Sequence, residues 1–233
     1  MDADRARSLV VEAQRRASYR LRGLFPDTGP YRRGLYPKHL AFMAAGFQHR
    51  ERCFLAGNRT GKTETGAYEC ALHLTGAYDQ YAPWWEGRRF HTPVRMWASG
   101  DTSKTTRDII QDKLCGPPGK FGTGLLPAHL ITDKSSKAGI PDALDSVWVK
   151  HVTGEQSVVQ FKSYDQRREA FQGTAQHVIW LDEECPEDIY AECLIRTAET
   201  SDFEGGMILI TFTPLLGVTP LVLSFLPGGH LPV

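Results

Sequence analysis

Residues 53–71 read CFLAGNRTGKTETGAYECA, an apolar run that leads into a glycine-containing loop and then into a helical pattern. Within this stretch, Ala56–Thr63 fits the phosphate-binding loop, with alanine in place of the first glycine. Gly57 and Gly61 allow the backbone to turn so that successive N–H groups point inward. The positive end of the following helix adds to this anion site. We therefore expect a nucleotide-binding α/β fold.

The loop supplies the candidate nucleotide contacts. Lys62 is expected to reach the β- and γ-phosphates, and the Thr63 hydroxyl is expected to ligate Mg²⁺. ATP and Mg²⁺ are therefore the expected cofactors. The full set of candidate contacts in the loop is Ala56, Gly57, Asn58, Arg59, Thr60, Gly61, Lys62 and Thr63.

A second motif supplies the carboxylates that such a loop needs. Residues 177–184 read HVIWLDEE, an apolar strand that ends in three acidic residues. Asp182 is the candidate metal ligand, acting mostly through water because Mg²⁺ keeps much of its hydration. Glu183 is the candidate base that orients the water attacking the γ-phosphate, a role that argues against a metabolite kinase. Glu184 is expected to be a solvated neighbour or an ion-pair partner.

The rest of the chain alternates between strand and helix patterns. Apolar runs predict strands at 53–56, 94–99, 177–182 and 207–212. Helical spacing predicts helices at 4–21, 39–46, 62–74, 103–114 and 186–197. A turn signal between 147–152 and 157–162 predicts a hairpin, and glycines and prolines predict an irregular excursion at 116–141. This alternation predicts a mainly parallel sheet sandwiched by helices, with ligands at the carboxyl ends of the strands.

Charge and composition limit the class of protein. The 233 residues carry 27 basic and 27 acidic side chains, but residues 1–62 hold 13 basic and 5 acidic ones. This basic part is a candidate surface for DNA or a partner subunit, or else a solvated helix. Its candidate phosphate contacts are Arg5, Arg7, Arg15, Arg16, Arg20 and Arg22. The absence of a bilayer-length apolar run and of any CxxC pair among five cysteines predicts a soluble protein in a reducing compartment.

With both nucleotide motifs in place, the chain resembles the ATPase domain of the large terminase subunit of tailed bacteriophages, the motor that packages DNA into the procapsid. The resemblance runs from about Leu35 to Leu216 and includes GLYPKHLAFMAAG, WWEGRRF, FKSYDQRREAFQG and LITFTPLLG. It implies a P-loop NTPase of the ASCE/RecA-like class, with an N-terminal helical extension at 1–34 and an ATPase domain at 35–233. Full large terminases continue into a nuclease domain, which we do not expect within these residues.

The resemblance also implies roles for residues outside the two motifs. Tyr36 and His39 occupy the place of the family's adenine-contacting segment, with His39 where Gln would be expected. Packing at the start of a helix is the alternative for both residues. Thr211 and Thr213 match the family's coupling motif, whose hydroxyls would link the γ-phosphate to movement, although a strand-ending turn has the same pattern.

Motors of this class also stabilise the transition state with an arginine. Arg59, inside the loop, is the candidate that would act in cis. Arg167 or Arg168 is the candidate for the arginine supplied to a neighbouring subunit, and Arg168 is the one we select. Surface solvation is the alternative for each.

The implied function is an ATPase that couples hydrolysis to translocation of double-stranded DNA. The implied partners are the portal protein, the small terminase subunit and further copies of the chain in a ring, expected to be a pentamer. The implied location is the cytoplasm of the infected bacterium, with no membrane association and no place in the mature virion. The alternatives are a helicase-like DNA-remodelling ATPase, a nucleotide-dependent assembly module with little turnover, and a nucleotide kinase.

Overall fold

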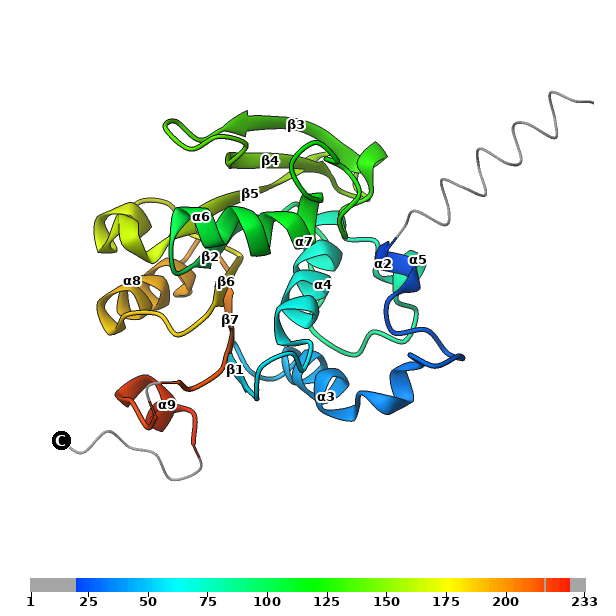
Figure 1. The fold of residues 1–233 in the computed structure, drawn as a ribbon, viewed down its shortest axis with the longest axis horizontal. Helices are drawn as coiled ribbons and strands as arrows, with labels where there is room; N and C mark the ends of the chain where they lie inside the picture. Colours follow the sequence, from blue (N-terminus) through cyan, green and yellow to red (C-terminus); the bar gives the residue numbers. More distant parts are fainter. Residues whose placement is uncertain (1–19, 216, 227–233) are drawn as a thin grey trace, which may run out of the picture.

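The computed structural model describes residues 20–215 and 217–226, and its central feature is a seven-stranded sheet with helices on both faces (Figure 1). The strand order is β1-β7-β6-β2-β5-β4-β3. The first five of these strands are parallel, and β4 and β3 join through antiparallel pairs. The bounds are β1 (Glu51–Leu55), β2 (Arg95–Gly100), β3 (Ile131–Ser136), β4 (Leu144–Lys150), β5 (Gln156–Ser163), β6 (Val178–Asp182) and β7 (Met207–Phe212). The predicted mainly parallel α/β sheet is confirmed.

β6 and β7 lie in the interior because they are apolar on both faces. Every residue of these two strands is buried. Successive side chains of a strand point to opposite faces of the sheet. Each strand therefore contributes side chains to two hydrophobic clusters, one on each face. Trp180 belongs to the larger cluster, whereas its neighbour Ile179 belongs to the smaller one.

Helices cover these two clusters on opposite faces of the sheet (Figure 1). The larger cluster packs under α3 (Pro37–Ala45), α4 (Lys62–Thr75) and α5 (Tyr78–Tyr81). The smaller cluster packs under α8 (Glu187–Thr197) and α9 (Pro220–Ser224). The helices predicted at 39–46, 62–74 and 186–197 are therefore present, with ends that differ by no more than two residues.

The prediction of an irregular excursion at 116–141 is wrong in part. Ile131–Ser136 forms β3, which pairs with β4 and extends the predicted hairpin to three strands. β3 is mostly exposed and polar, so it lacks the alternating apolar pattern that reveals a half-buried strand.

The helix predicted at 103–114 is present, but it is not a regular α-helix. Thr102 caps its start through a capping box with Thr105. A π-helical turn at Thr106–Gln111 separates α6 (Ser103–Thr105) from α7 (Asp112–Cys115). The buried Gln111 side chain donates to Asp142 O and accepts from Leu144 N, so this turn is tied to the start of β4.

The helix predicted at 4–21 lies mostly outside the described residues, as do Arg5, Arg7, Arg15 and Arg16. The described end of the extension is helical at α2 (Arg20–Gly23). Leu21 and Phe25 are buried in the larger cluster, and Arg20 Nη2 donates to Glu64 Oε1 at 2.8 Å. The extension thus packs against the first turn of α4. Among the described helices, none has the length and apolarity to span a bilayer.

Candidate nucleotide-binding site

The loop from Ala56 to Thr63 joins the end of β1 to the start of α4, and two of its residues adopt a left-handed backbone. Gly61 has φ 89° and Arg59 has φ 60°. Gly61 caps α4 without any side chain, so the first N–H groups of the helix are left for an acceptor outside it. A helix start of this kind is an anion site, and the loop therefore fits a phosphate group.

Lys62 turns back into this loop. Its Nζ donates to Gly57 O at 2.7 Å and to Thr213 Oγ1 at 2.8 Å. Burial lowers the pKa of Lys62, and the nearby charges of Glu183 and Asp182 offset part of that effect. Both hydrogen-bond partners of the ammonium are neutral, so an anionic group at this place would be the stronger partner.

Asp182 connects the acidic strand to the loop helix. Its Oδ1 accepts from Thr63 Oγ1 at 3.0 Å and from Thr211 Oγ1 at 2.6 Å, and Trp180 Nε1 in turn donates to Thr211 Oγ1 at 2.8 Å. Burial raises the pKa of Asp182 to about 7, although the two threonine hydrogen bonds act in the opposite direction. A carboxylate beside a threonine hydroxyl is a set of hard oxygen donors, which is what Mg²⁺ binds.

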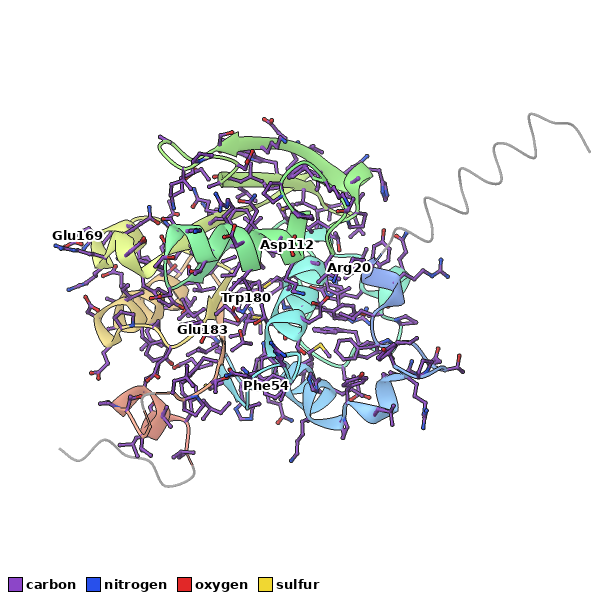
Figure 2. All side chains as sticks on the ribbon, in the orientation of Figure 1. Arg20, Phe54, Asp112, Glu169, Trp180 and Glu183 are labelled. Atoms are coloured by element: carbon purple, nitrogen blue, oxygen red, sulfur yellow. The ribbon has the colours of Figure 1, made fainter. Side chains whose placement is uncertain are left out.

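Glu183 follows at the end of β6 (Figure 2). Its φ of 72° is uncommon for a residue other than glycine. The Glu183 N–H donates to Thr211 O at 3.0 Å, and Tyr164 Oη donates to the carbonyl oxygens of Asp182 and Glu183 at 3.1 and 3.2 Å. Burial raises the pKa of Glu183, which the charge of Lys62 partly offsets. A raised pKa suits a carboxylate that accepts a proton near neutral pH.

The two hydroxyls of the predicted coupling motif occupy different places. Thr211 is buried between Trp180 and Asp182, and its hydroxyl already accepts from one and donates to the other. Thr213 lies at the loop, where it accepts from Lys62 and donates to Asn58 Oδ1 at 2.9 Å. Thr213 is therefore the hydroxyl of this pair that contacts the phosphate-binding loop.

A cleft of about 760 Å³ lies beside the loop, lined mainly by α3 and β1. His39 lines this cleft, and its ring nitrogen Nε2 donates to Thr60 O at 2.7 Å. Tyr36 packs its ring edge-on against Phe25 and His39, at centroid distances of 5.9 and 5.4 Å. The structure thus places His39 at the loop and Tyr36 in the packing at the start of α3.

The candidate arginines lie in different settings. Arg59 is exposed in the loop. Arg168 Nε donates at 3.0 Å to Glu192 Oε2 on α8, and the Arg168 side chain is 50% exposed. Arg196 also holds Glu192. Loop, acidic strand and coupling motif therefore meet in one place, whereas Arg168 is anchored to α8.

Two supporting residues were not found from the sequence, and a third has a different role from the one expected. Trp180 donates a hydrogen bond to the Thr211 hydroxyl. Tyr164 donates to the backbone carbonyls of Asp182 and Glu183. The sequence signal for Trp180 is an indole within an otherwise aliphatic run, opposite a small residue, Gly66, in the helix after the loop. Glu184 differs from its expected role, since its Oε1 accepts from Thr219 Oγ1 and its Oε2 is buried, so among the described residues it forms no ion pair.

Comparison with known proteins gives the family. Residues 53–228 match the family "Terminase large subunit, T4likevirus-type, N-terminal". The large terminase subunit of Salmonella phage P22 is 38% identical over 208 residues, which cover 82% of this chain and 41% of that protein. The chain thus spans less than half the length of this relative. A solved structure of the Thermus phage P74-26 large terminase ATPase domain has a TM-score of 0.53 at 18% identity, covering 89% of this chain and 71% of that one, which is a likeness of fold. The chain belongs to the terminase large subunit family, and the match lies in that family's N-terminal region.

Proposed function

We propose that this chain is an ATP-hydrolysing motor domain of a large terminase, which couples ATP hydrolysis to translocation of double-stranded DNA into a procapsid. The observation that carries the proposal is a pair of hydrogen bonds, Lys62 to Thr213 and Thr63 to Asp182, which tie the loop to the carboxyl ends of β7 and β6. Parallel α/β sheets bind ligands at this edge. The Thermus phage P74-26 protein with a similar fold is an ATPase domain, which agrees with this assignment.

In this proposal the loop binds the triphosphate of ATP. The first N–H groups of α4 and the Lys62 ammonium bind phosphate oxygens, and the Lys62 ammonium exchanges neutral partners for charged ones. Thr63 and Asp182 would hold Mg²⁺, which supplies charge neutralisation to the phosphates during transfer. The cleft beside His39 offers room for the base of the nucleotide.

Glu183 is the proposed general base. Its carboxylate would accept a proton from the attacking water, and its raised pKa brings that step closer to neutral pH. Arg59 is the proposed arginine acting in cis, and Arg168 the proposed arginine acting on a neighbouring subunit. Thr213 would respond to the presence of the γ-phosphate, because it accepts a hydrogen bond from Lys62, the residue proposed to bind that phosphate.

The proposed partners are double-stranded DNA, the portal protein, the small terminase subunit and further copies of this chain in a pentameric ring. The proposed setting is the cytoplasm of the infected bacterium. Arginines of residues 1–22 are the candidate phosphate contacts, and such contacts make affinity for DNA fall steeply with salt.

The test compares ATP turnover by the wild-type chain with that of Lys62→Ala, Glu183→Gln and Lys120→Ala. Lys120 is an exposed lysine in a loop away from the site and serves as the matched control. We expect each site variant to lose at least about 100-fold in turnover, the scale seen when a single electrostatic group is removed from an active site. Lys120→Ala should hydrolyse ATP at the wild-type rate.

The same assay with a DNA duplex over a salt series tests the motor. We expect DNA to stimulate turnover and the stimulation to weaken as salt rises. Wild-type turnover in Lys62→Ala or Glu183→Gln would refute the assignment of the site. Tight ATP binding without hydrolysis in the wild type would instead support a nucleotide-dependent assembly module.

A further inference from the structure

Glu184 is the third carboxylate of the acidic run at the end of β6, and its side chain is turned to a part of the fold that the proposed chemistry does not use. Oε1 accepts a hydrogen bond from Thr219 Oγ1. Oε2 is buried and has no hydrogen-bond partner among the described residues. The charge of Glu184, after burial itself, contributes to raising the pKa of the Cys53 thiol in β1 to about 12. The carboxylate thus lies between the end of β6, β1 and the start of α9.

The Thr219 hydroxyl has two partners. It donates to Glu184, and it accepts from Val222 N at 3.3 Å, which makes Thr219 the N-cap of α9. α9 has five residues, too few for a helix to be stable without tertiary contacts. Its buried contacts are Leu221 and Val222, each 4% exposed, in the smaller cluster. Its C-cap residue Phe225 also packs on this cluster, edge-on against Tyr190. The place of α9 therefore depends on this cap and on these apolar side chains.

Glu184 also stands next to the strained residue of the site. Glu183 has a left-handed backbone, which costs energy unless the surroundings hold it. Thr211 O holds the Glu183 N–H, and Tyr164 Oη holds the Glu183 carbonyl. The bond from Glu184 to Thr219 is a further attachment of this turn, and it is the attachment that leads to α9.

We propose that Glu184 is a positioning residue for Glu183, and that its hydrogen bond to Thr219 makes the Glu183 turn and helix α9 move as one unit. The inference rests on the proposed function, in which Glu183 activates water. A change of position of Glu183 during hydrolysis would then be transmitted to α9 through one short contact.

The contact has the properties of a releasable attachment. One carboxylate oxygen is satisfied and the other is buried without a donor, so the bound arrangement keeps a desolvation cost that a fully satisfied carboxylate would not have. Release exposes this oxygen to water and leaves α9 held by its apolar contacts, those of Leu221, Val222 and Phe225. Glu184 therefore stabilises the turn without locking it.

The test uses Glu184→Ala and Thr219→Val, with Thr219→Ser and Glu187→Ala as controls. Thr219→Ser keeps the hydroxyl, and Glu187 is an exposed carboxylate three residues after Glu184. Single-turnover kinetics give the hydrolysis rate of bound ATP, and a fluorescent ATP analogue gives the dissociation constant. Hydrogen exchange at the amides of residues 221–224 reports on α9 without reference to chemistry.

We expect Glu184→Ala and Thr219→Val each to slow hydrolysis at least about tenfold, a loss typical of a misplaced reacting group, while the dissociation constant stays within about threefold. Exchange in α9 should rise in both. The double variant should be no slower than either single variant, because both remove the same contact. Both controls should stay within about twofold of the wild type.

Wild-type hydrolysis in Thr219→Val, or losses that add in the double variant, would overturn the inference. If Glu184→Ala melts well below the wild type, the two Thr219 variants test the contact instead, because Thr219→Val removes the hydroxyl and Thr219→Ser keeps it. If Glu183→Gln hydrolyses ATP normally, the proposed function fails. The exchange of α9 in Glu184→Ala would still show separately whether the attachment exists.

Discussion

Lys62 Nζ lies 2.8 Å from Thr213 Oγ1, so the lysine of the phosphate-binding loop and the last hydroxyl of the strand-ending motif share a hydrogen bond. Thr213 also donates to Asn58 Oδ1, so it bridges two parts of the loop. A phosphate group at the loop would compete for Lys62, because an ammonium group binds an anionic oxygen more strongly than it binds a neutral hydroxyl. Thr213 is thus the residue whose partner is expected to change when nucleotide binds.

Thr213→Val should separate binding from coupling. Valine removes the acceptor for Lys62 and the donor for Asn58, but it leaves the loop backbone in place. We expect ATP affinity to stay within about threefold, since a neutral competitor for Lys62 is lost and no phosphate contact is removed. Stimulation of hydrolysis by DNA should fall. Fluorescent-nucleotide titration and ATPase assays with and without duplex measure the two quantities, and Thr213→Ser, which keeps the hydroxyl, should retain both. Equal DNA stimulation in Thr213→Val and wild type would exclude Thr213 from coupling.

The part of the fold that the sequence predicts well is the part with a strong burial pattern. β7 lies at the predicted residues 207–212, because an apolar run bounded by polar turns leaves one interpretation. β3 was missed because it is an exposed, polar strand whose existence depends on pairing with β4. The helices α5 and α9 have four and five residues, too short for a helical period to be visible.

The candidate site shows the same division. Lys62, Thr63 and Asp182 could be proposed as candidates because each belongs to a contiguous motif whose chemistry fixes the residue type, and the structure brings them to the same edge of the sheet. The supporting pairs could not be found in this way. Trp180 and Thr211 are 31 residues apart, and Glu184 and Thr219 are 35 apart, so only the folded sheet brings them together.

The metal-free protein should lose stability as pH rises through neutrality. Burial raises the pKa of Asp182 from 3.8 to about 7. A folded pKa above the unfolded one means that folding favours the protonated form, so this contribution is complete below about pH 4 and is lost as pH rises through about 7. At about 1.4 kcal/mol per unit, roughly 2 kcal/mol disappears between about pH 5.5 and pH 8.

Denaturant unfolding in a chelator at these two pH values, for wild type and Asp182→Asn, measures this contribution. The variant has no carboxylate to titrate, so the wild type should lose more stability than Asp182→Asn does. The difference between the two proteins cancels other titrating groups, such as the buried His73. Added Mg²⁺ at the higher pH should stabilise the wild type and not the variant. Identical pH dependence in both proteins would show that Asp182 does not titrate in this range.

Arg59 and Arg168 should differ in the isolated chain. Arg168 is bound to Glu192, which is 2% exposed and also held by Arg196, whereas Arg59 is exposed at the loop itself. We expect Arg59→Ala to lower turnover at least about tenfold, within the range of transition-state arginines. Arg168→Ala should stay within about threefold. In an assembled ring, a loss of turnover in Arg168→Ala that is recovered on mixing with Lys62→Ala would assign Arg168 to a neighbouring subunit, and an unchanged turnover would leave it as an anchor for α8.

Gly66 in α4 gives a test of the support beneath Asp182. A Cβ at this position would lie 2.6 Å from Cε2 and Nε1 of Trp180, the indole that donates to Thr211. Gly66→Ala should therefore displace the indole and cost about 1–3 kcal/mol of stability, as overpacking does. It should also weaken Mg²⁺ binding, so that hydrolysis requires more Mg²⁺. The double variant Gly66→Ala/Trp180→Phe should regain much of the stability, because the smaller ring relieves the contact. It should not regain the wild-type affinity for Mg²⁺, because phenylalanine has no N–H to hold Thr211.

Gly34→Ala is the matched control, since a Cβ there meets nothing within 4 Å. Thermal melts and Mg²⁺ titrations of ATP hydrolysis separate the two effects, and a double variant that regains both would show that the Trp180 N–H does not position Asp182.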